Sequence, residues 1–87
     1  MILEKGKRVF SSVKEAEKYI EETYVGKLVH FWYWHRFKYN MKEKVEKVDR
    51  ATIDITFNPP HVILFFIDGT KNEFHKDDFF NDVKLLN

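Results

Sequence analysis

The residue types best suited to binding chemistry gather on one segment, Leu28 to Lys38, in which aromatic and basic side chains are dense. In an extended strand, the side chains of every second residue point to the same face. One face of this segment carries two indole rings followed by two cations: Trp32, Trp34, Arg36 and Lys38. Indole rings stack on nucleobases with about 1–3 kcal/mol per base, and neighbouring cations contact phosphates. The pattern therefore predicts a platform for single-stranded nucleic acid or for a protein partner.

The same segment also allows an interpretation in which both tryptophans are buried. The alternate face carries side chains expected of a core: Val29, Phe31, Tyr33, His35, Phe37 and Tyr39. If a helix packs on the first face as well, each tryptophan buries about 150–250 Å² there. A short chain needs such large side chains because its core is thin. Both interpretations remain open from the sequence.

The other polar clusters do not predict catalysis or metal binding. The run His75-Lys76-Asp77-Asp78 lacks metal-ligand spacing, and acidic residues at a helix start are favoured by the helix dipole. The remaining histidines have no acid or nucleophile at a recognisable spacing, and there is no cysteine. The three glycines are too scattered to form a phosphate-binding loop. We therefore expect a protein that is not an enzyme, without cofactor or metal.

Charge and composition narrow the class of protein. The formal net charge is +1, so a strongly basic nucleic-acid-binding protein is not expected. Residues 27–50 nevertheless carry seven basic and three acidic side chains, which makes this part of the chain locally basic. Lys, Phe, Asn and Ile are common and Ala, Gly and Pro are scarce, a composition typical of an AT-rich genome. This composition suggests a bacterium, phage or plasmid as the source.

The chain of 87 residues predicts one domain, 1–87. Its longest apolar run, Val62 to Ile67, has six residues, whereas a membrane-spanning helix needs about 20. No apolar stretch follows the charges at the N-terminus, so we expect no secretory signal. The lack of cysteine fits a reducing compartment. These features predict a cytoplasmic protein that does not bind membranes.

A helix is the clearest local prediction. Ser12 and Glu15 form a capping box, in which the serine hydroxyl accepts a hydrogen bond from the backbone N–H of Glu15. The residues at helical spacing that predict the buried stripe are Val13, Ala16 and Ile20, helped by Tyr19 and Tyr24. Together with a short strand before it, this helix makes up an N-terminal extension over residues 1–26.

Strands follow in residues 27–87. Aromatic and β-branched residues predict a strand from Lys27 to Asn40, and the charged run Met41 to Lys47 predicts a loop or hairpin tip. Ala51 to Phe57 alternates apolar and polar residues, with a bulge or bend near Asp49-Arg50. The later elements are a turn at 58–61, a buried strand at 62–67, a type I′ turn at Asp68-Gly69, a strand at 70–75, a helical turn at 76–82 and a last strand near 83–86.

Residues 25–86 resemble small Src-homology-3-like barrels of the Tudor and KOW type. Val25 to Phe31 resembles the opening strand of such barrels, Leu64 to Thr70 with Glu73-Phe74 the central hairpin, and Val83 to Leu86 the closing strand. The resemblance implies five strands and a 3₁₀ turn near Asp77 to Phe80. The N-terminal extension and the charged 40s loop depart from the pattern, and no residue matches the ligand-binding sites of Tudor or KOW modules.

The sequence thus predicts an α+β domain with one N-terminal helix packed on a strongly bent antiparallel sheet or small five-stranded barrel. We expect a non-enzymatic binding module, nucleic-acid-associated or regulatory, whose working residues are Trp32, Trp34, Arg36 and Lys38. The alternative is a protein–protein interaction or homodimerisation module that uses the same residues.

Overall fold

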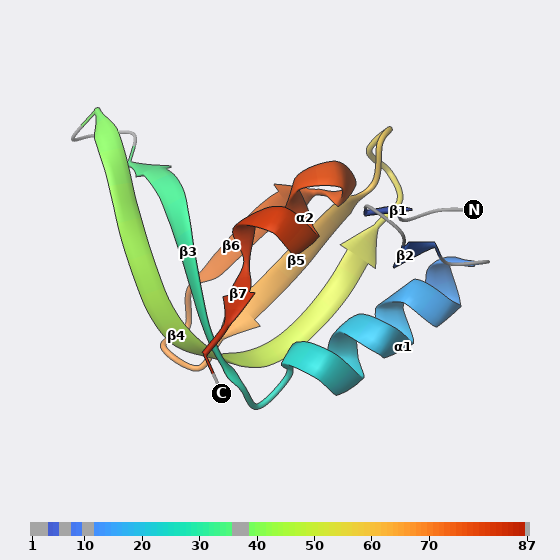
Figure 1. Ribbon diagram of the computed structural model, residues 1–87, viewed down its shortest axis with the longest axis horizontal. Coiled ribbons are helices and arrows are strands. Elements are labelled where there is room, and N and C mark those ends of the chain that lie inside the picture. Colours follow the sequence, from blue (N-terminus) through green and yellow to red (C-terminus); the bar gives the residue numbers. More distant parts are fainter. Residues whose placement is uncertain (1–3, 6–7, 10–11, 36–38, 87) are drawn as a thin grey trace.

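A computed structural model describes residues 4–5, 8–9, 12–35 and 39–86 of the chain and shows an α+β fold (Figure 1). In chain order the elements are β1 (Glu4–Lys5), β2 (Arg8–Val9), α1 (Val13–Tyr24), β3 (Leu28–His35), β4 (Asn40–Asp54), β5 (His61–Phe66), β6 (Lys71–His75), α2 (Lys76–Asp82) and β7 (Lys84–Leu85). The predicted fold class is confirmed, with a second helix where the sequence predicted a helical turn.

Helix α1 begins as its capping residues dictate. Ser12 is the N-cap in an extended conformation, and its hydroxyl oxygen accepts from the N–H of Glu15 at 3.1 Å. The helix buries Ala16, Ile20 and Tyr24 of the predicted stripe, and its first member, Val13, is partly buried. After Val25, Gly26 adopts a φ of +83°, which an L side chain rarely tolerates, and the chain turns into β3.

The larger sheet is antiparallel, with the strand order β6-β5-β4-β3-β7. The long strand β4 is shared by two hairpins, because its first half pairs with β3 and its second half pairs with β5. The register shifts between Val48 and Arg50, so the predicted bulge is confirmed, and Figure 1 shows β4 curving strongly through this region. The sheet is not closed into a barrel, so the predicted alternative of a closed five-stranded barrel is wrong.

The charged run Met41 to Lys47 was predicted to be a loop or a hairpin tip, and this prediction is wrong because the run is a paired strand. These residues form the first half of β4 and pair with β3 in a continuous register from Trp34↔Met41 to Leu28↔Lys47. Half-exposed strands tolerate charged side chains on their wet positions. The charges therefore suggested a loop, although the run forms a strand by pairing with the aromatic residues of β3.

The turn between β5 and β6 also differs from its prediction. The N–H of Phe66 donates to the carbonyl of Thr70 at 2.8 Å, and the N–H of Gly69 donates to the carbonyl of Phe66 at 3.0 Å. These bonds define a three-residue loop with Gly69 at a φ of +89°, rather than a two-residue type I′ turn. The glycine was predicted for its positive φ, and that part is correct.

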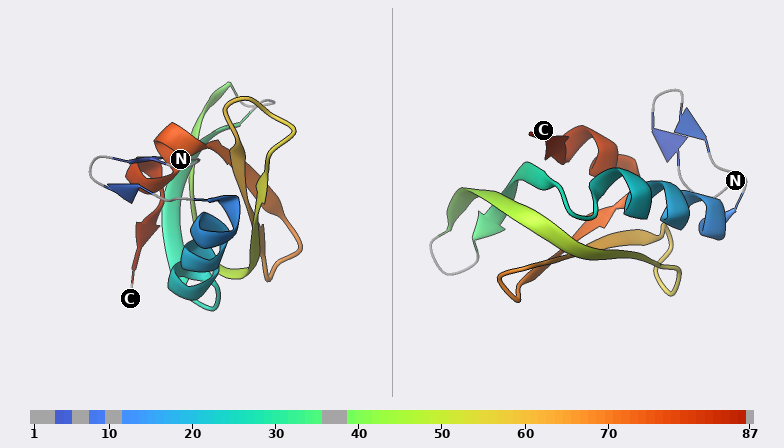
Figure 2. Two further views of the ribbon diagram at one scale, coloured as in Figure 1. Left: turned by 90° about the vertical axis from the view of Figure 1, so that its right-hand side faces the viewer. Right: turned by 90° about the horizontal axis from the view of Figure 1, so that it is seen from below.

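Both helices pack on one core with the sheet (Figure 2). Tyr24 of α1 meets Phe79 of α2 edge-on with ring centroids 5.0 Å apart, and Tyr19 lies 6.2 Å from Phe80. The hairpin of β3 and β4 extends past these helices and past the pairing with β5 and β7 (Figure 2). We call this extension, residues 31–35 and 40–46, the arm.

Candidate functional site

The two faces of β3 differ sharply in burial. Phe31 is fully buried and lies 5.6 Å from the ring of Phe66 and 5.1 Å from that of Phe74. Its neighbour Trp32 is 53% exposed, and Trp34 is 58% exposed. The interpretation in which α1 covers the tryptophans is therefore wrong, and the prediction that Val29 and Phe31 belong to the core is confirmed.

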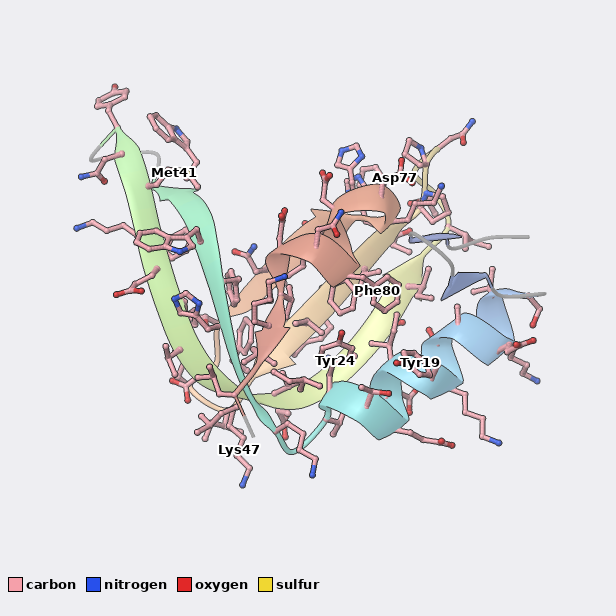
Figure 3. All side chains as sticks on the ribbon, in the orientation of Figure 1. Tyr19, Tyr24, Met41, Lys47, Asp77 and Phe80 are labelled. Carbon is pink, nitrogen blue, oxygen red and sulfur yellow. The ribbon has the colours of Figure 1, made fainter. Side chains whose placement is uncertain are left out.

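Residues of β4 extend the exposed surface around the indoles. Directly paired residues in an antiparallel sheet share a face, so the register places residues of β4 beside those of β3. We call the shared surface the tryptophan face; its members are Leu28, His30, Trp32, Trp34, Met41, Glu43, Val45 and Lys47. Met41 and Val45 are each 50% exposed, and Figure 3 shows Met41 near the tip of the arm and Lys47 at its base.

The tryptophan face is hollowed at the edge of β3. A hollow of about 370 Å³ is lined by His30, Trp32, Met41, Asn81, Asp82 and Lys84. The arm forms one wall, and the end of α2 with β7 forms the other. A partner's side chain fits a hollow of this size, with Trp32 and Met41 as apolar walls and Asp82 and Lys84 as polar groups.

The other two predicted site residues, Arg36 and Lys38, lie outside the described residues. The structure thus places Trp32 and Trp34 on one face. The role predicted for Arg36 and Lys38 stays a prediction. Lys84, which the sequence analysis did not single out, supplies a cation beside Trp32. Its pairing with His30 brings it there, and no local pattern in the sequence indicates this.

Two further lysines of the arm are on the other face. Lys42 pairs with Tyr33 and Lys44 pairs with Phe31, so both point to the side of the core. The Nζ of Lys44 donates to Oδ2 of Asp68 at 2.8 Å and lies 5.4 Å from the centre of the Phe66 ring. This bond ties the arm to the turn between β5 and β6.

Asp68 is held ionised by these contacts. The hydrogen bond from Lys44 is the main cause that lowers the pKa of Asp68 far below its ordinary value, and the hydroxyl and N–H of Thr70 add to it. At the far end of β4, Asp54 accepts from the hydroxyl and the N–H of Thr56, which lowers the pKa of that carboxyl as well. Both carboxylates cap turns rather than face the hollow.

Two histidines have acidic partners that the sequence analysis missed. His30 lies on the tryptophan face with its Nε2 2.8 Å from Oε2 of Glu43, and its ring meets that of Trp32 edge-on at 6.0 Å. His61 Nδ1 lies 3.5 Å from Oε1 of Glu73. Both pairs join neighbouring strands, so they depend on the register, which spacing along the chain does not reveal.

The second histidine belongs to an aromatic stack at the turn before β5. The ring of His61 stacks on Phe57 with centroids 4.0 Å apart, and His75 lies 4.7 Å from it. In the described part of the chain, no group of three or more His, Asp or Glu side chains has a metal-binding arrangement. Lys76 pairs with Asp77 at 2.8 Å, within the run that the sequence analysis considered for metal binding.

Among the residues described, no helix has the length and apolarity needed to cross a bilayer. Searches against protein-family models, curated proteins and solved structures found no match for this chain.

Proposed function

We propose that this chain is a protein-binding module that uses its tryptophan face as the contact surface. The observation that carries the proposal is the exposure of Trp32 and Trp34 side by side on one face, next to the hollow. Tryptophan and methionine are enriched in the buried centres of protein interfaces, and tryptophan dominates their binding energy. An exposed cluster of such side chains marks an interaction surface.

The charges on this face favour a protein over a nucleic acid. Glu43 pairs with Trp32, Asp82 and Lys84 line the hollow beside it, and Lys47 lies at the base of the same face, so the described charges on and around the face are balanced. Lys42 and Lys44 point to the other side. A nucleic acid needs an excess of cations along its phosphates, whereas a polar rim of both signs is typical of protein interfaces.

The proposed module has no catalytic role. Serine occurs only at Ser11 and Ser12, and Ser12 serves as the cap of α1. The acid that pairs with His30 is the exposed Glu43, and the described groups around the hollow do not include a hydroxyl or thiol nucleophile. The polar groups there suit recognition of a partner.

A second candidate is binding of single-stranded nucleic acid. Two exposed indoles at alternate positions, with Lys84 beside Trp32, form a stacking surface with one cation in reach. Salt separates the candidates, because phosphate contacts release counterions and apolar contacts do not.

Selection from a random-peptide display library tests the proposal, with the intact chain as bait and a Trp32→Ala/Trp34→Ala double variant for counter-selection. We expect peptides that quench the tryptophan emission, with an affinity that changes less than about twofold between low and moderate salt. Phe57→Ala is a matched control, because Phe57 is an exposed aromatic residue of the turn before β5 and should leave binding intact.

Failure to select any peptide, together with oligothymidylate binding that weakens steeply with salt, would overturn the protein-binding proposal in favour of the second candidate. Peptides that bind the double variant as well as the intact chain would show that another surface is the contact site.

A further inference from the structure

The outer edge of β3 is unpaired over its second half. The N–H of Leu86 donates to the carbonyl of Leu28 at 3.0 Å, and β7 pairs with β3 at Val29 and His30. Backbone groups of alternate residues in a strand point to the same edge, so those of Trp32 and Trp34 point to the side of β7. Helix α2 ends at Asp82, and no described strand continues β7 along Trp32 to Trp34.

Other open edges of the larger sheet are protected. The first half of β4 has charged side chains along its edge, β6 has Lys71 and Glu73, and β7 has Lys84. Charged side chains, lysine above all, block the pairing of edges between chains. The second half of β4 is covered by α1, where Oε2 of Glu17 accepts from the N–H of Ile53 at 3.1 Å.

Within its described residues, β3 itself carries no charged side chain along its free edge. From Phe31 to Trp34 its residues are all aromatic. An exposed, flat and apolar edge pairs readily with another strand, and aromatic side chains on paired strands stabilise each other. A strand that fits this edge must itself be aromatic or β-branched, free of charge and open along one side.

Within the described residues, β3 itself meets these requirements. We propose, as a specific form of the proposed protein-binding function on which it rests, that two copies of the chain pair through the free edges of β3. The pairing is antiparallel about a two-fold axis near Tyr33, so that Trp32 of each copy lies opposite Trp34 of the other. It joins the two sheets into one and brings the four indoles together on one face. Because Lys84 occupies the edge at His30, pairing is confined to the part of β3 beyond that residue.

Proline at position 34 tests the pairing mode. The N–H of Trp34 points to the free edge and takes no part in the ladder with β4, and an edge strand tolerates proline where its N–H faces solvent. Lys71→Pro is a matched control: the carbonyl of Thr70 accepts from Phe66, so by alternation the N–H of Lys71 points away from β5 on the edge of β6. Circular dichroism of both variants checks that the fold is kept.

Sedimentation equilibrium over a range of concentrations then gives the mass. We expect the intact chain and Lys71→Pro to approach twice the chain mass of 10.6 kDa, with dissociation constants within about twofold of each other. Trp34→Pro should raise the dissociation constant at least about tenfold, because its N–H bond and indole contacts are lost. A monomeric intact chain at every concentration, or a Trp34→Pro variant that dimerises as well as the intact chain, would overturn the inference.

Amide hydrogen exchange on the intact chain provides a test without substitutions. Protection of the Trp34 amide should rise with protein concentration, while that of the Lys71 amide should stay constant. A Trp34 amide that exchanges equally fast at all concentrations contradicts the pairing. A monomer that still binds selected peptides through Trp32 and Trp34 would overturn the dimer alone. A dimer that binds no peptide would support self-pairing and contradict the binding of a different protein partner.

Discussion

Oε2 of Glu17 on α1 accepts a hydrogen bond from the backbone N–H of Ile53 on β4 at 3.1 Å, and a second one from the hydroxyl of Thr52 at 2.9 Å. The carboxylate thus takes the place of a neighbouring strand along the second half of β4. Among the described residues, no strand pairs with the edge of β3 at Trp32 and Trp34. This contrast is the structural basis for the proposed pairing of two copies through β3.

Replacing Glu17 should expose the edge that it protects. We expect Glu17→Ala to lower the free energy of unfolding by about 1–3 kcal/mol, because the partly buried N–H of Ile53 loses its acceptor. Glu17→Gln retains an oxygen acceptor and should lose less. Glu21→Ala, an exposed change on the same helix, should stay within about 0.5 kcal/mol of the intact protein in urea unfolding. A Glu17→Ala variant as stable as the Glu21→Ala variant would contradict the assigned role.

Adjacent positions of β3 should respond very differently to truncation. Phe31→Ala should cost about 3–5 kcal/mol of unfolding free energy, since its ring is fully buried between Phe66 and Phe74. Trp32→Ala should cost less than about 1 kcal/mol in the monomer, because more than half of the residue is exposed. Urea titrations at low protein concentration measure both. Similar losses for the two variants would mean that the strand faces are assigned the wrong way round.

The ion pair between Lys44 and Asp68 should make stability depend on pH. Because the pKa of Asp68 is lowered in the folded protein, its carboxylate contributes stability above the unfolded value of about 3.9 and loses it as the pH falls towards the folded value. Asp68→Asn keeps an oxygen for Thr70 and removes the charge. The difference in unfolding free energy between the intact chain and this variant should be constant from about pH 7 to 5 and shrink below about pH 4. A difference that persists unchanged into acid would show that the charge contributes nothing.

The hydrogen bond at the N-cap of α1 should make its own measurable contribution to stability. Ser12→Ala should lower the unfolding free energy by about 1 kcal/mol, because the N–H of Glu15 loses its acceptor. Ser12→Asp restores an acceptor and favours the helix dipole, so its stability should equal or exceed that of the intact protein. Thermal unfolding followed by circular dichroism gives the comparison. Equal stability of the alanine and aspartate variants would show that the side chain at position 12 does not stabilise the helix.

Local signals predicted much of the fold. The spacing of Ser12 and Glu15 located the start of α1, the positive φ of Gly69 follows from the Asp-Gly turn, and the phase change near Asp49-Arg50 indicated the bulge in β4. Each of these features depends on residues within a few positions of one another. The resemblance to Src-homology-3-like barrels remains a prediction.

Features that depend on register escaped prediction. Residues 41–47 look like a loop because their charges mask a strand that forms by pairing with β3. The pair of His30 and Glu43 and the position of Lys84 beside Trp32 arise from the same pairing. Alternation in β3 predicted that Trp32 and Trp34 share a face. Whether that face is buried could not be predicted, because it depends on where α1 packs on the sheet.

Fluorescence of single-tryptophan variants measures directly whether Trp32 and Trp34 form an exposed surface. Trp32→Phe and Trp34→Phe each leave one indole, and both are measured at a protein concentration low enough to keep the chain monomeric. We predict emission close to that of free tryptophan in water and strong quenching by acrylamide in both variants, because both indoles are more than half exposed. Blue-shifted emission that acrylamide does not quench, in either variant, would place that indole in the core and contradict the exposure on which the proposed function rests.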